Sequence, residues 1–270
     1  MTETNHSKHL GATAGWRWFM TALQAVRFDA SRLFLVVFFY TTLMGLFMII
    51  PVAGSVLAAI FMPFGTVLIG YATRDALQKK RPGLSPILKV WSDPYVRTNL
   101  ITTGLFYGLV LISAQALYGY LAEPYAAQWQ VNSDDRLVWE SVFTHFPWWP
   151  LCIASLLYIP GLMSTWFSPL LCASKRMSWG KALFYSFFGC LRNILPILVL
   201  GIVLIAGIAI SFVIASQLID LLGLHSINMF IYFPLSCFVF TVVYSTYWPM
   251  YEALFGDAQS DKDTNNEGVA

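Results

Sequence analysis

Residues Leu33–Thr73 read LFLVVFFYTTLMGLFMIIPVAGSVLAAIFMPFGTVLIGYAT and contain no Asp, Glu, Lys or Arg. A helix that crosses a membrane needs about 20 mainly apolar residues, so this stretch is long enough for two crossings. Near its middle lies Pro51-Val52-Ala53-Gly54, which carries the Pro and Gly of a turn. The stretch therefore predicts two membrane-spanning helices joined by a tight turn.

The rest of the chain contains four further charge-free stretches, each long enough for one crossing. Of all residues, 57% are hydrophobic and 11% are charged, whereas a soluble domain carries about 25% charged residues. This composition excludes a soluble globular fold and a disordered chain. We therefore predict an all-α polytopic membrane protein whose six transmembrane helices form three hairpins. The predicted spans are Leu33–Ile50, Ser55–Tyr71, Leu100–Leu121, Trp148–Ala173, Ile194–Ile219 and Ile227–Tyr247.

Basic residues divide unequally between the two sides of these spans. All Lys and Arg residues except Arg136 fall on the side that also holds both termini. Because Lys and Arg concentrate in cytoplasmic loops, we predict that both termini are cytoplasmic. The chain then divides into a flexible N-terminal segment (1–14), a six-span domain (15–255) and a disordered, acidic cytoplasmic tail (256–270). We expect no nucleic-acid partner, since the basic residues adjoin the spans.

The second outer connection, residues 122–147, is long enough to hold structure of its own. Its apolar residues recur at helical spacing, and they are Trp139, Val142, Phe143 and Phe146. We expect a short helix on the outer membrane face, with Asp134 and Asp135 in its first turn, where the helix dipole favours anions. Two interpretations remain open: a capped helix that shields the bundle, or a docking site for a partner protein.

Three times along the chain, a basic amphipathic segment precedes a predicted hairpin and ends in Arg directly before a span. A helix with a basic polar face and an aromatic apolar face lies in the membrane interface. We therefore predict interfacial amphipathic helices on the cytoplasmic face. The three segments are Gly15–Arg32, Leu84–Arg97 and Met177–Arg192, of which the second is the weakest because Pro86 and Pro94 interrupt it. The alternative is that any protein of several hairpins places Arg and Trp at this boundary.

Two further patterns concern the packing of the spans. Proline next to aromatic residues predicts a bend in the outgoing span of each hairpin, for which helix packing is the favoured interpretation and a gating hinge the alternative. These steps are Phe61-Met62-Pro63, Phe167-Ser168-Pro169 and Tyr247-Trp248-Pro249. Gly104 and Gly108 form a G-x-x-x-G pattern, which lets another helix approach closely, either inside the bundle or in a dimer.

The predicted span interiors lack the residues that chemistry inside a membrane would need. They contain no Asp, Glu, Lys or Arg, which disfavours a proton-coupled transporter. The four Cys and four His show no metal-binding spacing, and no nucleophile or nucleotide-binding motif occurs. We therefore predict that the protein is not an enzyme and holds no metal or cofactor. The remaining catalytic possibility is a pair formed by Asp220 and His225 at the outer boundary.

Four short motifs carry a resemblance to known proteins. They are Gly15-Trp16-Arg17-Trp18, Pro51-Val52-Ala53-Gly54, Trp166-Phe167-Ser168-Pro169 and Leu191-Arg192-Asn193-Ile194-Leu195-Pro196. Through them the chain resembles an uncharacterised family of Gram-negative bacterial multi-spanning inner-membrane proteins with a G-W-x-W start and an L-R-N-x-x-P motif. The resemblance covers roughly residues 15–255. It implies an inner-membrane location and a helical fold, and it implies no activity or functional residues.

These observations favour a non-enzymatic inner-membrane protein that acts by binding membrane lipids or another envelope protein. The candidates for contact with a lipid headgroup are Trp166, Lys175, Arg176, Arg192 and Asn193. The alternative explanation of these basic residues is topology alone. A second hypothesis is a transporter or channel for a neutral or amphipathic solute, which a one-sided cavity lined by Gln115, Ser and Thr would favour.

Overall fold

A computed structural model of the chain describes residues 10–51, 53–83, 85–132, 136–223 and 228–256, and it confirms the predicted all-α fold. The helices are α1 (Thr13–Phe28), α2 (Ala30–Met48), α3 (Ala53–Leu77), α4 (Ser85–Ser92), α5 (Pro94–Ala126), α6 (Trp139–Thr144), α7 (Trp148–Trp166), α8 (Ser168–Lys175), α9 (Trp179–Arg192), α10 (Ile194–Leu222), α11 (Asn228–Ser245) and α12 (Tyr247–Phe255). The predicted flexible start and disordered tail fall largely on residues 1–9 and 257–270, outside the described residues.

Six helical segments within the described ranges are long and apolar enough to cross a membrane, as predicted. They are α2, α3, α5, α7 with α8, α10, and α11 with α12. Several run farther than the charge-free stretches predicted. For example, α5 begins at Pro94 because the carboxylate of Asp93 accepts hydrogen bonds from the first amides of the helix, and Pro is well suited to the first helical position. This early start shortens the second amphipathic segment to the eight residues of α4.

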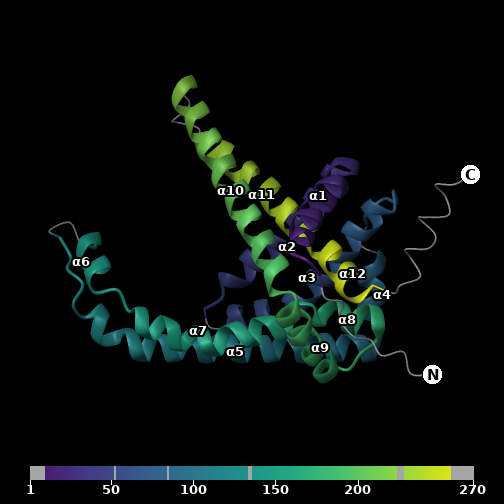
Figure 1. Cartoon of the computed structure of the whole chain (residues 1–270), viewed down its shortest axis with the longest axis horizontal. Helices are drawn as coiled ribbons and strands as arrows, with labels where there is room; N and C mark the ends of the chain where they lie inside the picture. Colours follow the sequence, from purple (N-terminus) through teal and green to yellow (C-terminus); the bar gives the residue numbers. More distant parts are fainter. Residues whose placement is uncertain (1–9, 52, 84, 133–135, 224–227, 257–270) are drawn as a thin grey trace, which may run out of the picture.

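The spans pair as the three predicted hairpins: α2 with α3, α5 with α7, and α10 with α11. Figure 1 shows the α5–α7 and α10–α11 hairpins diverging from a common region, around which α4, α8, α9 and α12 gather. We call this region the junction end, and the opposite tips of the hairpins the far ends. Helix α1 packs against α3, α10 and α11, and so connects the first hairpin to the third.

Helices α1 and α9, which correspond to the first and third amphipathic segments, bury mainly small residues, with Trp18 as the one buried aromatic residue of α1. Gly15 and Ala22 of α1, like Ala182 of α9, face the protein. The predicted aromatic faces are exposed instead: Trp16 is 52% exposed and Phe184 is 61% exposed. Small side chains allow close helix approach, so each helix packs on the bundle while its aromatic face remains free for lipid. The interfacial placement itself stays a prediction.

Gly104 and Gly108 pack α5 against α3, which is the in-bundle interpretation of their spacing. A Cβ atom at Gly104 would lie 2.6 Å from the carbonyl oxygen of Ala59, and a Cβ at Gly108 would lie 3.0 Å from the Cβ of Ala59. The distance at Gly104 is shorter than a Cβ atom can approach another atom, and the neighbouring atom belongs to the backbone of α3, which cannot move aside as a side chain can. Glycine at position 104 therefore sets how closely the first and second hairpins approach.

The three proline steps differ from one another. Helices α7 and α8 meet at Phe167, just before Pro169, and α11 and α12 meet at Thr246, just before Pro249. In contrast, Pro63 lies inside the continuous helix α3. The predicted bend thus becomes a helix break in the second and third hairpins and is absorbed within a single helix in the first.

The predicted outer helix is present as α6 (Trp139–Thr144) and is shorter than expected. Phe146 lies beyond its end, because it precedes Pro147 and the residue before a proline is disfavoured in a helix. Asp134 and Asp135 lie outside the described residues, so the prediction about the helix dipole stays a prediction.

Candidate functional site

The three hairpins enclose a cavity of about 640 Å³ that residues from all six spans line. Representative lining residues are Met44, Met62, Leu111, Gln115, Gly201 and Tyr244. The far side of the cavity reaches Met48 and Ser55, near the turn of the first hairpin. The cavity therefore lies between the three hairpins.

The junction end closes this cavity on one side. Trp166 and Tyr247 line it where α7 ends and α12 begins. Behind them, Phe167 packs against Tyr247 with 6.0 Å between ring centroids, and Phe167 and Leu170 are fully buried. The cavity is thus sealed towards the junction end and extends towards the far ends.

Tyrosines supply much of the polar character of the cavity wall. Tyr40 and Tyr244 meet edge to face with 5.8 Å between ring centroids, and Tyr107 and Tyr247 line the wall beside them. These tyrosines were not among the polar residues predicted from the sequence, which were charged residues, His, Gln, Ser and Thr within the spans. The available signal was a tyrosine within a charge-free stretch, since tyrosine combines a large apolar ring with one hydroxyl group.

The side chains lining the cavity determine which ligands it can hold. Among the described lining residues there is no Asp, Glu, Lys, Arg or His, so a charged ligand would lose its hydration without gaining a counter-charge. The volume lies within the range of about 300–1,000 Å³ that is usual for small-molecule sites. The site therefore suits a neutral, largely apolar molecule, with Gln115 and the tyrosine hydroxyls as polar contacts.

Asn193, one of the five predicted headgroup residues, is fully buried at the start of α10. Its Oδ1 accepts a hydrogen bond from the backbone N–H of Leu10 at 2.9 Å, and its Nδ2 donates to the carbonyl oxygen of Gly189 at 3.0 Å. The amide thus joins the segment before α1 to the end of α9. It serves the fold and does not face a headgroup.

The G-W-x-W and L-R-N-x-x-P motifs meet next to Asn193. A Cβ atom at Gly15 would lie 2.3 Å from the carbonyl oxygen of Pro196 and 2.8 Å from the backbone nitrogen of Leu200. Only glycine allows α1 to lie so close to α10. Trp18 fills the core beside this contact. Both motifs therefore contribute to packing at the junction end.

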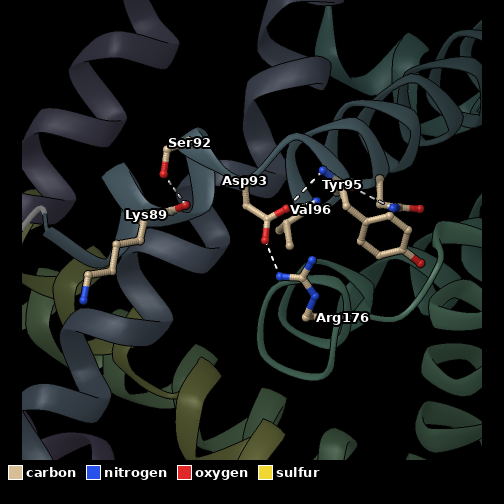
Figure 2. A network of polar contacts seen from close by, with 7 residues as sticks. Lys89, Ser92, Asp93, Tyr95, Val96 and Arg176 are labelled. Carbon is tan, nitrogen blue, oxygen red and sulfur yellow. Dashed lines mark hydrogen bonds and ion pairs between the residues drawn. The ribbon is translucent and has the colours of Figure 1, made fainter.

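Arg176, a second predicted headgroup residue, forms an ion pair with Asp93, as Figure 2 shows. The same carboxylate accepts hydrogen bonds from the backbone N–H groups of Tyr95 and Val96, at 3.1 and 3.3 Å. Desolvation raises the pKa of Asp93, but the hydrogen bonds from Val96, Arg176 and Tyr95 outweigh it and hold the pKa below its usual value. The pair connects the start of the second hairpin to the loop between α8 and α9.

The other three predicted headgroup residues have different surroundings. Trp166 lines the cavity, and its indole N–H is buried without a hydrogen-bond partner in the described part of the chain. Lys175 is half-buried at the end of α8, whereas Arg192 is exposed at the end of α9. The structure therefore does not gather the five residues on one exposed surface. Headgroup contact by Lys175, Arg176 and Arg192 stays a prediction.

The described residues contain no group of three His, Cys, Asp or Glu side chains that could hold a metal ion. Burial raises the pKa of the Cys190 thiol to about 12, so this cysteine is a poor nucleophile at neutral pH. The suggested partner of Asp220, His225, lies outside the described residues. The catalytic alternative therefore stays untested by the geometry.

Comparison with curated proteins finds a distant similarity over nearly the whole chain. The chain is 25% identical over 263 residues to a protein of Burkholderia thailandensis described as a probable inner membrane protein, and the match covers 92% of this chain and 93% of that protein. No protein-family model and no solved structure matches the chain. With its six spans, the chain is an integral, multi-pass inner-membrane protein.

Proposed function

We propose that the protein acts by binding, and that the cavity between its hairpins holds the apolar part of a neutral membrane lipid. The observation that carries this proposal is the cavity itself, whose wall comes from all six spans and includes no charged side chain among the described residues. An envelope protein is the other class of partner that the sequence suggested. A lipid is the better match, because a cavity of about 640 Å³ accommodates a small molecule.

The proposed function involves binding without a catalysed reaction. The cavity wall offers tyrosine hydroxyls, Gln115 and short hydroxyl side chains such as Thr66, and these groups orient a ligand through hydrogen bonds. A hydrolytic or transfer reaction would need an acid–base pair or an activated nucleophile beside the ligand. The residues that line the cavity supply neither.

Filling the cavity tests this proposal. Gly201 lines the cavity and Gly207 on the same helix does not, and a Cβ at either position meets nothing within 4 Å. We expect Gly201→Phe to occupy the cavity without disturbing the fold. Native mass spectrometry of protein extracted in mild detergent should then find a neutral lipid retained by the wild type and by Gly207→Phe, and lost from Gly201→Phe. Equal retention by all three proteins would overturn the proposal.

We also propose that the junction end and both termini face the cytoplasm. The support is the concentration of every Lys and Arg except Arg136 on that side of the spans. Green fluorescent protein fused after residue 270 should fluoresce, and alkaline phosphatase fused there should be inactive. The reverse pattern would place the termini on the opposite side.

A second candidate function is transport of a neutral or amphipathic solute. It is favoured by Gln115, Ser55 and Thr66 in the wall of a cavity that is sealed on one side. Proteoliposomes with a fluorescent neutral lipid analogue in both leaflets distinguish the two candidates. A membrane-impermeant quencher should remove only the outer half of the signal if the protein binds without transport, and nearly all of it if the lipid crosses.

A further inference from the structure

A second hollow, separate from the cavity, lies between α2, α3 and α4. This groove has a volume of about 410 Å³, and its walls are almost entirely apolar. Helix α2 contributes Phe39 and Leu43, and α4 contributes Leu88 and Trp91. Trp91 also packs on Phe64 of α3, with 5.1 Å between ring centroids. The groove is therefore bounded by two spans and by one of the short helices at the junction end.

The groove lies against the middle of both spans. On α3 its lining runs from Phe61 to Leu68, and on α2 it includes Phe39 and Leu43. Since α2 begins at Ala30 and rises about 1.5 Å per residue, these side chains lie about 14–20 Å along the span. An apolar groove against the middle of two membrane spans matches the apolar character of a lipid acyl chain.

A cationic group lies beside the groove, against its lining residue Trp91. The guanidinium of Arg97 lies over the ring of Trp91, 5.9 Å from its centroid, and donates a hydrogen bond to the carbonyl oxygen of Trp91 at 2.9 Å. One such bond leaves further guanidinium N–H groups available to an anion. Arg97 is therefore fixed beside the groove with donors to spare.

Further basic residues lie on α4 and on the segment before it. The connection between α3 and α4 exposes Lys79, Lys80 and Arg81, and α4 adds exposed Lys89. The two acidic residues of the same region are already paired, Asp75 with Arg74 and Asp93 with Arg176. Figure 2 shows Lys89 extending away from the pair of Asp93 and Arg176. The helix that forms one wall of the groove therefore adjoins an excess of positive charge.

We propose that this groove binds an anionic phospholipid, with one acyl chain between α2, α3 and α4 and the phosphate at Arg97. The inference is independent of the proposed function, because the groove and the cavity share only the side chains of Tyr40 and Met44, which separate them. The second amphipathic segment is the weakest of the three in sequence, because Pro86 and Pro94 interrupt it. Its short helix nevertheless lines the groove.

Two pairs of variants test the headgroup and chain contacts separately. The headgroup variant is Arg97→Gln, and its control is Arg17→Gln, which removes an exposed Arg from α1. The chain variant is Leu43→Trp, which fills the groove, and its control is Leu46→Trp on the exposed side of α2. Delipidated protein is titrated with phosphatidylglycerol and phosphatidylcholine of identical acyl chains, and the first binding event is followed by native mass spectrometry.

The wild type and both controls should prefer phosphatidylglycerol. Arg97→Gln should lower that preference about fivefold, the loss expected for one cation near a lipid surface. Phosphatidylcholine also carries a phosphate, so its binding should weaken too, but less, because its choline cation offsets the phosphate charge. Leu43→Trp should weaken the binding of both lipids alike. The proposal is overturned if Arg97→Gln behaves like Arg17→Gln, or if Leu43→Trp behaves like Leu46→Trp. A Leu43→Trp protein that fails to fold leaves the Arg97 pair as the deciding test.

Discussion

Helices α3 and α10 are both membrane spans, yet they relate to the protein in opposite ways. Helix α10 is the more apolar, with a mean hydropathy of 3.1 in its most apolar stretch against 1.9 for α3. Half of that stretch is buried in α3, whereas only 6% is buried in α10. The most apolar span is therefore the one that faces lipid most fully.

The apolar character of a helix therefore predicts that it lies in the membrane, but it does not predict which of its faces packs against the other helices. Lipid tails are as apolar as Leu, so helices associate in a membrane through close fit and small residues. Helix α3 meets α5 where Ala59 faces Gly104, and it accepts the ring of Tyr40 at Gly65. Helix α1 approaches α10 closely at the first turns of α10, where Gly15 faces Pro196.

The largest predicted effect compares one isoleucine on each of these helices. Ile69 of α3 is 1% exposed and Ile205 of α10 is 69% exposed. We expect Ile69→Ala to lower the free energy of unfolding by about 3 kcal/mol, because it removes packed methyl groups and leaves a void. Ile205→Ala should change it little, since lipid replaces the lost side chain. Unfolding by sodium dodecyl sulfate, followed by circular dichroism, measures both values, and equal losses would contradict the comparison.

The next effect tests the contact that holds the start of α10. Gly15→Ala places a Cβ against the backbone of Pro196 and Leu200 and should cost about 2 kcal/mol of unfolding free energy. The control is Gly180→Ala on α9, where a Cβ meets nothing within 4 Å. Thermal unfolding in detergent should show a lower midpoint for the first variant alone. Equal midpoints would mean that α1 can move away from α10 at no cost.

A somewhat smaller effect concerns the buried amide beside that contact. Asn193→Ala leaves the N–H of Leu10 and the carbonyl of Gly189 without their partner, which should cost about 1–2 kcal/mol. Gln217→Ala, at an exposed position on the same helix, is the control. Hydrogen exchange should increase at Leu10 in the first variant and stay unchanged in the second. Unchanged exchange at Leu10 would remove the positioning role assigned to Asn193.

The sequence predicts the parts of this fold that depend on local composition. The absence of charge over residues 33–73 and in the four later stretches is enough to place six spans, because a charge inside a membrane is costly at any point of the chain. The turn at residue 51 follows in the same way from Pro and Gly. The capping of α5 could also have been predicted, since Asp93-Pro94 is a common start of a helix.

The candidate sites depend on contacts between residues far apart in the sequence. Tyr40 and Tyr244 face each other in the cavity wall only because α2 and α11 are neighbours in space. Asn193 follows Arg192 at a membrane boundary and so resembles a headgroup ligand, but its partner is the amide of Leu10. No local pattern reveals such a partner, so the burial of Asn193 could not be predicted from the sequence.

The smallest predicted effect asks whether charge adds to packing at the junction end. Asp93 has a lowered pKa in the folded protein, so it contributes stability above its unfolded-state pKa of about 3.9, and that contribution is lost as the pH falls through the folded pKa. Arg176→Gln removes one cause of the lowering and should reduce the melting midpoint slightly at pH 7. The difference from the wild type should shrink as the pH approaches 3.

The control for this pH dependence is Arg192→Gln. Arg192 is exposed and precedes a span, and no carboxylate in the described part of the chain forms an ion pair with it. Its variant should follow the wild-type midpoint at every pH. If Arg192→Gln and Arg176→Gln lowered the midpoint equally at pH 7 and at pH 3, the ion pair with Asp93 would contribute nothing specific. The α8–α9 loop would then be held by packing alone.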